Sequence, residues 1–166
     1  MTYHVSVPRY KPMKHYFMPI EKDPNHALNS LWAVLYEGRF LPEVVHIIII
    51  KDEERDLFED MVNNVKTVTD NYDMNCEVEA MISDKDMRLE EMIENRYDDR
   101  TQLVLDISGA SKNLTAKILS SVDGDIFDKI YSLEIHKSEE KTKWYPQIDS
   151  EKISVVDLKK DKLEGR

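Results

Sequence analysis

The segment Ser108 to Asn113 carries the groups in this chain that are best suited to binding an anion. A mostly apolar run, residues 102–107, precedes it and is too short for a helix. Leu114, Ile118 and Leu119 follow it at the spacing of one helical face. The segment is therefore predicted to be a turn of small residues that joins a strand directly to a helix.

Such a turn can bind a phosphate or another anion. Small residues let a ligand approach the backbone, and a helix start offers unpaired N–H groups at the positive end of the helix dipole. Lys112 adds a mobile positive charge, although lysine is unfavourable for helix stability in a first turn, and this local conflict indicates function. The candidate ligand-binding residues in this turn are Ser108, Gly109, Ala110, Ser111, Lys112 and Asn113.

The same turn has an ordinary structural interpretation, in which Ser111 is only the N-cap of the helix. It is not a P-loop, because the spacing Gly-x4-Gly-Lys-Ser/Thr is absent, nor a dinucleotide fingerprint, because Gly109 stands alone. The chain has no Gly-x-Ser-x-Gly elbow of a serine hydrolase. Cys76 is the only cysteine, and no cluster has zinc-ligand spacing, so no metal site is expected.

A second polar loop follows residues 15–20, which read as the first strand. Asp23 and Pro24 form an N-cap and first-residue pair for a helix that Gly38 ends. His26 is expected to be a helix-surface residue, with the alternative that it is a general base. The candidate ligand-binding residues of this loop are Lys22, Asp23 and Asn25.

The remaining patterns predict an α/β fold. Residues 43–50 are apolar without alternation, as in a parallel strand buried on both faces, and residues 129–136 alternate as a sheet-edge strand does. The other elements are helices at 53–72 and near 84–93, a helix that follows the turn at 108–113 and is ended by Asp123 and Gly124, and strands at 75–82 and 152–158.

This order of elements predicts a Rossmann-like three-layer sandwich: a mainly parallel sheet with helices on both faces and an antiparallel edge near the C-terminus. Ligands bind such sheets beyond the carboxyl ends of the strands, where the strand order switches. We therefore expect the loops at 21–25 and 108–113 to meet. The predicted domain covers residues 14–158, between an N-terminal arm at 1–13 and a charged tail or truncated linker at 159–166.

The size, net charge and cysteine content of the chain limit the partners and the cell compartment that can be expected for it. The chain has 166 residues, the size of one domain, with 23 basic and 33 acidic side chains and a net charge of −10. A chain this acidic should repel duplex nucleic acid and anionic membranes, while a local cluster of positive groups can still bind a small anion. A single cysteine, no apolar run of membrane-spanning length and no signal peptide favour a cytoplasmic protein.

The segment Asp106-Ile-Ser-Gly-Ala-Ser-Lys-Asn113 resembles the Asp-x-Thr-Gly-Gly-Thr/Asn-Lys motif of CRISPR-associated Rossmann-fold (CARF) domains. Ser108 stands where threonine is usual and keeps the hydroxyl group, and Ala110 replaces the second glycine. The likeness extends to the order of elements from about residue 14 to residue 158. After the first strand, where many relatives have serine or threonine, this chain offers Lys22, Asp23 and Asn25.

The resemblance implies a sensor of cyclic oligoadenylates in type III CRISPR antiviral defence, and cyclic tetra-adenylate is the ligand expected first among them. It implies a homodimer that holds the ring across its two-fold axis and needs no cofactor. The turn at 108–113 would bind phosphates, and Lys22 and Asn25 would reach sugar or base edges. Many relatives carry an effector domain, so this sensor acts alone or controls an effector domain or partner that is missing here.

Three alternatives stay open at this point. In the first, the chain is a metal-independent ring nuclease, in which a ribose 2′-hydroxyl attacks its own phosphate and Lys112 and Ser108 stabilise the developing charge. In the second it is a mononucleotide-binding regulator unrelated to CRISPR, and in the third it is a structural subunit with an empty site. His46, in an apolar strand, is expected in the core. Trp144 and Tyr145 either pack against the sheet edge or form part of a lid that stacks on adenines.

Overall fold

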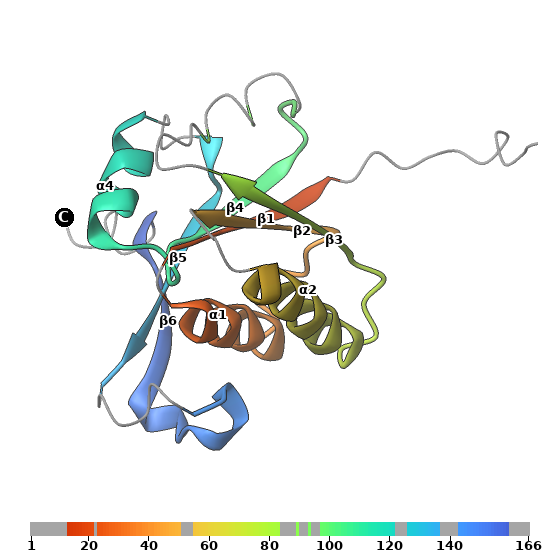
Figure 1. The fold of residues 1–166 in the computed structure, drawn as a ribbon, viewed down its shortest axis with the longest axis vertical. Coiled ribbons are helices and arrows are strands. Elements are labelled where there is room, and N and C mark those ends of the chain that lie inside the picture. The colour runs from red at the N-terminus through yellow and green to blue at the C-terminus, as the bar shows by residue number, and fades with distance from the viewer. Residues whose placement is uncertain are drawn as a thin grey trace, which may run out of the picture.

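The computed structural model describes residues 13–21, 23–50, 55–83, 89, 93, 97–121, 126–136 and 143–159. One sheet has the strand order β3-β2-β1-β4-β5-β6 (Figure 1). The strands are β1 (Lys14–Ile20), β2 (Val44–Ile50), β3 (Glu77–Ser83), β4 (Gln102–Asp106), β5 (Lys129–Ile135) and β6 (Ile153–Asp157). The helices are α1 (Pro24–Tyr36), α2 (Arg55–Asp70) and α4 (Lys112–Ser121), with 3-10 turns at Tyr145–Gln147 and Ser150–Lys152.

Strand pairing confirms the predicted Rossmann-like fold. The pairs β1–β2, β1–β4, β2–β3 and β4–β5 are parallel, and β5–β6 is antiparallel. The prediction that residues 129–136 form the edge strand is wrong, because β5 lies between β4 and β6. Its alternation arises because Tyr131 and Leu133 pack into the core while Glu134 points to solvent.

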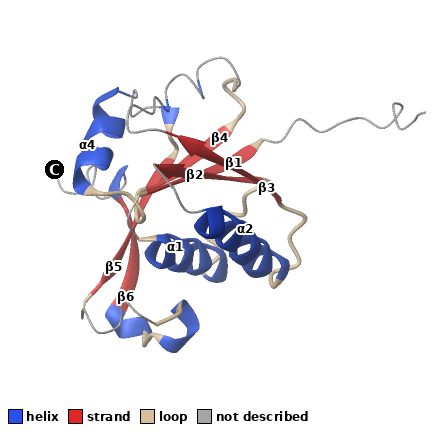
Figure 2. Ribbon diagram, viewed as in Figure 1, coloured by secondary structure: helices blue, strands red, loops and turns tan. Residues whose placement is uncertain are grey.

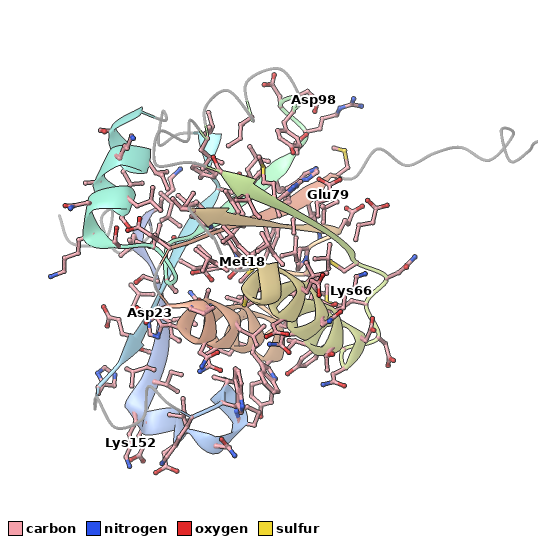
Figure 3. The ribbon with its side chains drawn as sticks, viewed as in Figure 1. Met18, Asp23, Lys66, Glu79, Asp98 and Lys152 are labelled. Atoms are coloured by element: carbon pink, nitrogen blue, oxygen red, sulfur yellow. The ribbon has the colours of Figure 1, made fainter. Side chains whose placement is uncertain are left out.

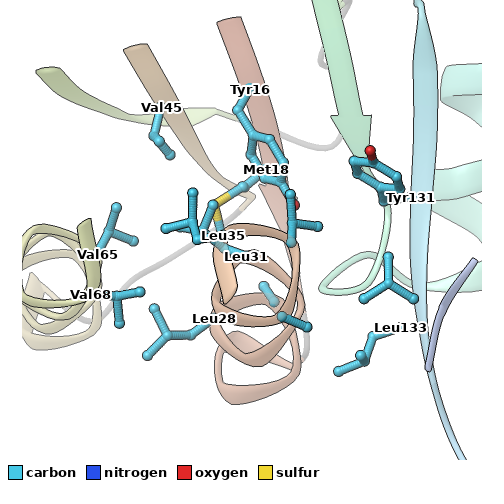
Figure 4. Packing of buried hydrophobic residues seen from close by; sticks show 14 of the residues in the cluster. Tyr16, Met18, Leu28, Leu31, Leu35, Val45, Val65, Val68, Tyr131 and Leu133 are labelled. Atoms are coloured by element: carbon cyan, nitrogen blue, oxygen red, sulfur yellow. The ribbon is translucent and has the colours of Figure 1, made fainter. Parts of the chain in front are cut away.

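Helices cover both faces of the sheet (Figure 2). On one face α1 and α2 bury Met18, Leu31 and Val65 together (Figure 4). On the other face α4 contributes Leu114 and Ile118 to a second core. All seven residues of β2 are buried between these layers, as its unbroken apolar run predicted.

The predicted start and end of α1 are confirmed, but the side chain of Asp23 forms no capping hydrogen bond. Asp23 occupies the N-cap, Pro24 is the first helical residue, and Gly38 follows the helix with a φ of 65°, in the left-handed region that favours glycine. The helix expected near residues 84–93 falls largely outside the described residues. Of that segment, Leu89 and Ile93 are described, and both are buried. Residues 1–12 of the expected arm and 160–166 of the expected tail also lie outside.

His46 is a satisfied core residue, as expected. Its Nε2 lies 2.9 Å from Nδ1 of His15, and its Nδ1 lies 3.2 Å from Oε2 of Glu79. Both imidazoles are buried, and the ring of Phe17 stacks on His46 with centroids 4.5 Å apart. This chain of contacts ties β1, β2 and β3 together across one face of the sheet.

The segment that contains Trp144 and Tyr145 packs against α1. Buried Asn29 donates from Nδ2 to the carbonyl oxygen of Lys143 at 2.8 Å and accepts, through Oδ1, from the N–H of Tyr145 at 2.8 Å. Trp144 lines a shallow hollow with Trp32 and residues of α2. These two aromatic residues therefore contact the helices on one face of the sheet, whereas the packing prediction placed them at the sheet edge.

Replacement of Asn29 should destabilise the domain. Asn29→Ala removes two hydrogen bonds of a fully buried amide, so the free energy of unfolding should fall by about 1–3 kcal/mol in urea titrations. Asn63→Ala, at an exposed position of α2, is the matched control and should change it by less than about 0.5 kcal/mol. Equal effects of the two substitutions would contradict the anchoring role of Asn29.

Candidate functional site

The loops that follow β1 and β4 lie side by side, as predicted. The N–H of Glu21 donates to the carbonyl oxygen of Gly109 at 2.9 Å. The hydroxyl of Ser111 donates to Oε2 of Glu21 at 3.1 Å. Because β1 and β4 are adjacent, parallel and distant in sequence, this is the point at which the strand order switches.

Gly109 is required by the packing of these two loops. A Cβ at this position would lie 2.9 Å from Cβ of Ala27, 3.2 Å from Cγ1 of Ile20 and 3.4 Å from the carbonyl oxygen of Asp23. The sequence interpretation, in which small residues here let a ligand approach, therefore needs correction at this residue. The missing side chain lets the β4–α4 turn close against the start of α1.

Asp106, at the end of β4, fixes the turn from inside. It is buried, its Oδ1 accepts from the N–H of Ser108 at 2.9 Å, and the hydroxyl of Tyr16 donates to its Oδ2. Burial raises the pKa of Asp106, and hydrogen bonds from Ser108 and Tyr16 oppose part of that rise. Burial, and then the charge of Asp106, holds the pKa of Tyr16 well above its ordinary value.

Two of the predicted ligand-binding hydroxyl groups already have protein partners. Oγ of buried Ser108 accepts from the N–H of Leu133 at 2.8 Å, which joins the turn to β5. Oγ of Ser111 accepts from the N–H of Leu114 at 3.1 Å, so Ser111 is the N-cap of α4. These contacts make both serines part of the frame that holds the turn.

The first turn of α4 leaves donors for a ligand. Within the described part of the chain, the N–H groups of Lys112 and Asn113 donate to no protein acceptor, as expected for the first positions of a helix. Both side chains are exposed. Two main-chain donors, the positive end of the dipole and the Lys112 ammonium group therefore face the same region.

A hollow of about 370 Å³ opens beside this turn, and we name it the carboxyl-edge hollow. Ser108, Ala110 and Lys112 of the turn line it on one side. The rest of its lining consists of His26 of α1, Ile107 after β4, Thr115 and Ala116 of α4, and Ser132 of β5. The sequence pattern gave no reason to include Thr115 or Ser132, because only the packing of α4 against β5 brings them to this edge.

His26 is half-buried at the start of α1. Its Nε2 lies 3.0 Å from the carbonyl oxygen of Leu133. A carbonyl oxygen only accepts hydrogen bonds, so Nε2 carries the hydrogen, and in the neutral ring Nδ1 is left as an acceptor. The histidine thus joins α1 to β5 and contributes to the lining of the carboxyl-edge hollow.

The remaining predicted residues divide into two groups. Asp23, on the loop before α1, and Asn25, in the first turn of α1, are exposed and do not line the hollow (Figure 3 labels Asp23). Lys22 lies outside the described residues.

Among the residues that the structure describes, no group of three or more histidine, cysteine or acidic side chains could hold a metal ion. No helix in the described ranges is long and apolar enough to cross a membrane.

Solved structures with a similar fold include two proteins with a cyclic nucleotide ligand or activator. No family model and no curated protein matches the sequence. The chain superposes on a type III CRISPR defence DNA nuclease activated by cyclic oligoadenylate with a TM-score of 0.52, at 13% identity, over 75% of this chain and 18% of the nuclease.

The chain also superposes on Enterococcus italicus Csm6, bound to cyclic hexa-2′-fluoro-hexa-dAMP, with a TM-score of 0.51 at 15% identity. That match covers 88% of this chain and 42% of Csm6. The chain thus spans less than half of either protein. At such identities the likeness is one of fold alone, and it agrees with the Rossmann-like fold that the order of elements predicted.

Asp106 should give the domain a specific pH dependence. Because folding raises its pKa above the ordinary 3.8, the folded state binds this proton more tightly, and stability falls as pH rises from 3.8 to the raised pKa. Asp106→Asn keeps the shape and removes the titration. The unfolding free energy of the wild type relative to this variant should therefore fall across that range, by at most about 1.4 kcal/mol per pH unit.

Urea unfolding of both proteins between about pH 4 and about pH 8 measures this difference and cancels the other titrating groups. Asp128→Asn, at an exposed position, is the control, since its carboxylate also accepts from a backbone N–H. A difference that stays constant with pH for Asp106→Asn would contradict a raised pKa.

Proposed function

We propose that this chain is a sensor domain that binds a cyclic oligoadenylate, with cyclic tetra-adenylate as the expected ring, and controls an effector domain or partner in type III CRISPR defence. The observation that carries the proposal is the first turn of α4. Two unpaired N–H groups and Lys112 lie there beside a hollow, in a fold shared with a nuclease that cyclic oligoadenylate activates. Phosphodiester groups suit these donors.

The carboxyl-edge hollow suits the nucleoside part of such a ligand. Its volume of about 370 Å³ is within the range of small-molecule sites. Its wall combines apolar Ile107 and Ala110 with the hydroxyl groups of Thr115 and Ser132. The free Nδ1 of His26 is an acceptor of the kind that an adenine amino group or a ribose hydroxyl requires.

Symmetry favours a dimer as the binding unit. A ring with an even number of adenylates has a two-fold axis, and a C2 homodimer presents two identical edges to it. Each subunit would then bind half of the ring with the residues at 108–113, with Asp23 of the neighbouring loop and with Asn25 of the first turn of α1. Lys22 belongs to the same proposed set.

Loss of the Lys112 charge should weaken ring binding. Lys112→Ala removes a charge-assisted contact to phosphate, so binding should weaken by about 1–3 kcal/mol, roughly a 5- to 150-fold higher Kd. Isothermal titration with cyclic tetra- and hexa-adenylate measures the Kd and the stoichiometry, which should be one ring per two chains.

Lys66→Ala, at an exposed position on α2 (Figure 3), is the matched control and should bind the ring as the wild type does. Unchanged affinity of Lys112→Ala would remove the lysine from the site. Binding of AMP, with no binding of either ring, would favour the mononucleotide-dependent regulator instead.

The position of His26 favours one second candidate, a metal-independent ring nuclease. In this reaction a ribose 2′-oxygen bonds to the adjacent phosphorus and the bond to the 5′-oxygen breaks, which leaves a 2′,3′-cyclic phosphate and a 5′-hydroxyl. Nδ1 of His26 would take the 2′-hydroxyl proton, the departing 5′-oxygen would take a proton from water, and Lys112 would stabilise the developing charge. Labelled cyclic tetra-adenylate incubated with the protein tests this: a linear product identifies the nuclease, and intact ring identifies the sensor.

A further inference from the structure

A second hollow lies at the opposite edge of the sheet, where β1, β4 and β5 begin. It encloses about 330 Å³, and we name it the amino-edge hollow. Lys14 and Gln102 are paired at the starts of β1 and β4, and Lys129 is the first residue of β5. Since these strands are parallel, this edge is separated from the loops at 21–25 and 108–113 by the length of the sheet.

The lining of the amino-edge hollow is positively charged. Three cationic side chains, Lys14, Arg39 and Lys129, line it, against one acidic side chain, Asp128. Oδ2 of Asp128 already accepts from the N–H of Leu103 at 2.9 Å. In the described part of the chain, none of the three cations forms an ion pair with a carboxylate. Such an excess of two positive charges is unusual in a chain whose net charge is −10.

Uncharged partners hold two of these cations in place. Nζ of Lys129 donates to the carbonyl oxygen of Arg39 at 2.9 Å, and Nη1 of Arg39 donates to the carbonyl oxygen of Val155 at 2.5 Å. Both charges also lie over the ring of Tyr131, 5.0 Å from its centroid for Arg39 and 5.8 Å for Lys129. These contacts fix the positions of the cations without neutralising them, which preorganises the hollow for an anion.

The carboxyl end of α1 accounts for only part of this arrangement. Arg39 follows that end, where a cation is favourable for the helix dipole. Lys14 and Lys129 belong to strands, and the ammonium group of Lys14 donates no hydrogen bond within the described part of the chain. The ammonium group of Lys14 is therefore available to a ligand in the hollow.

The same hollow has an apolar wall and open space. Phe40 and Leu41 line it, and 51% of the surface of Leu41 is exposed. A Cβ built on Gly38 would meet no atom within 4 Å. An occupant can therefore place an apolar group against Leu41 while its charged group contacts the cations.

We propose that the amino-edge hollow binds a small organic phosphate monoester, with the phosphate between Lys14, Arg39 and Lys129 and the organic group against Phe40 and Leu41. Near neutral pH a phosphate monoester carries about −1.5 to −2 charges, which matches the local excess. The volume lies at the lower end of the range for small-molecule sites. This inference is independent of cyclic oligoadenylate binding, because it uses the other edge of the sheet.

Phenyl phosphate, titrated into the ¹⁵N-labelled full chain, tests the proposal by amide chemical shifts. Saturable shifts are expected at Gly38, Gln102 and Lys129. Lys14→Gln should raise the Kd roughly tenfold, the effect of one lost charge-assisted contact. Lys129→Gln, which keeps a donor for the carbonyl oxygen of Arg39, should do the same. The far-UV circular dichroism and melting temperature of each variant show that it is folded.

The controls distinguish binding that depends on the phosphate charge from non-specific binding of the aromatic ring. Benzyl alcohol, a neutral molecule with the same ring, should give no saturable shifts, and Lys66→Gln should bind phenyl phosphate as the wild type does. Three outcomes would overturn the proposal: no saturable shifts, shifts at Ala110 and Asn113 in place of those at the amino edge, or wild-type affinity in both lysine variants. Failure of cyclic tetra-adenylate to bind would leave these shifts unchanged, so the two proposals fail separately.

Discussion

The close contact between Gly109 and the start of α1 is the constraint on which the candidate site depends. Two strands distant in sequence, β1 and β4, run side by side, and both of their outgoing loops must fit into the same space. A Cβ at Gly109 would lie only 2.9 Å from Cβ of Ala27. Because glycine removes this clash, the N–H of Glu21 reaches the turn, and α4 begins directly beside the loop that precedes α1.

A buried carboxyl group fixes the same turn at some cost in stability. Burial of Asp106 is unfavourable for its charged form, and hydrogen bonds from Tyr16 and Ser108 offset part of that penalty. In return the N–H and hydroxyl groups of Ser108 are bound within the protein, and Ser111 caps α4. The groups left without protein partners are those at the first turn of α4, where a ligand can reach them.

The distribution of charge makes the two proposed anion sites, one at each edge of the sheet, compatible with an acidic chain. The net charge of −10 is a property of the whole surface, whereas a bound ligand senses the few charges within about 10 Å. At the carboxyl edge, Lys112 adds its charge to the dipole of α4. At the amino edge, carbonyl oxygens and the ring of Tyr131 hold Arg39 and Lys129 together without neutralising them.

The sequence by itself determined the α/β class, the ends of α1, the buried strand β2 and the two loops that meet, because apolar periodicity and capping residues act locally. It did not determine that β5 is internal, that Gly109 serves loop packing, or that Thr115, Ser132 and three separated cations line hollows. Those properties depend on which strands become neighbours and which helix lies over them. Contacts between segments distant in sequence determine this arrangement, and a local sequence pattern does not contain information about such contacts.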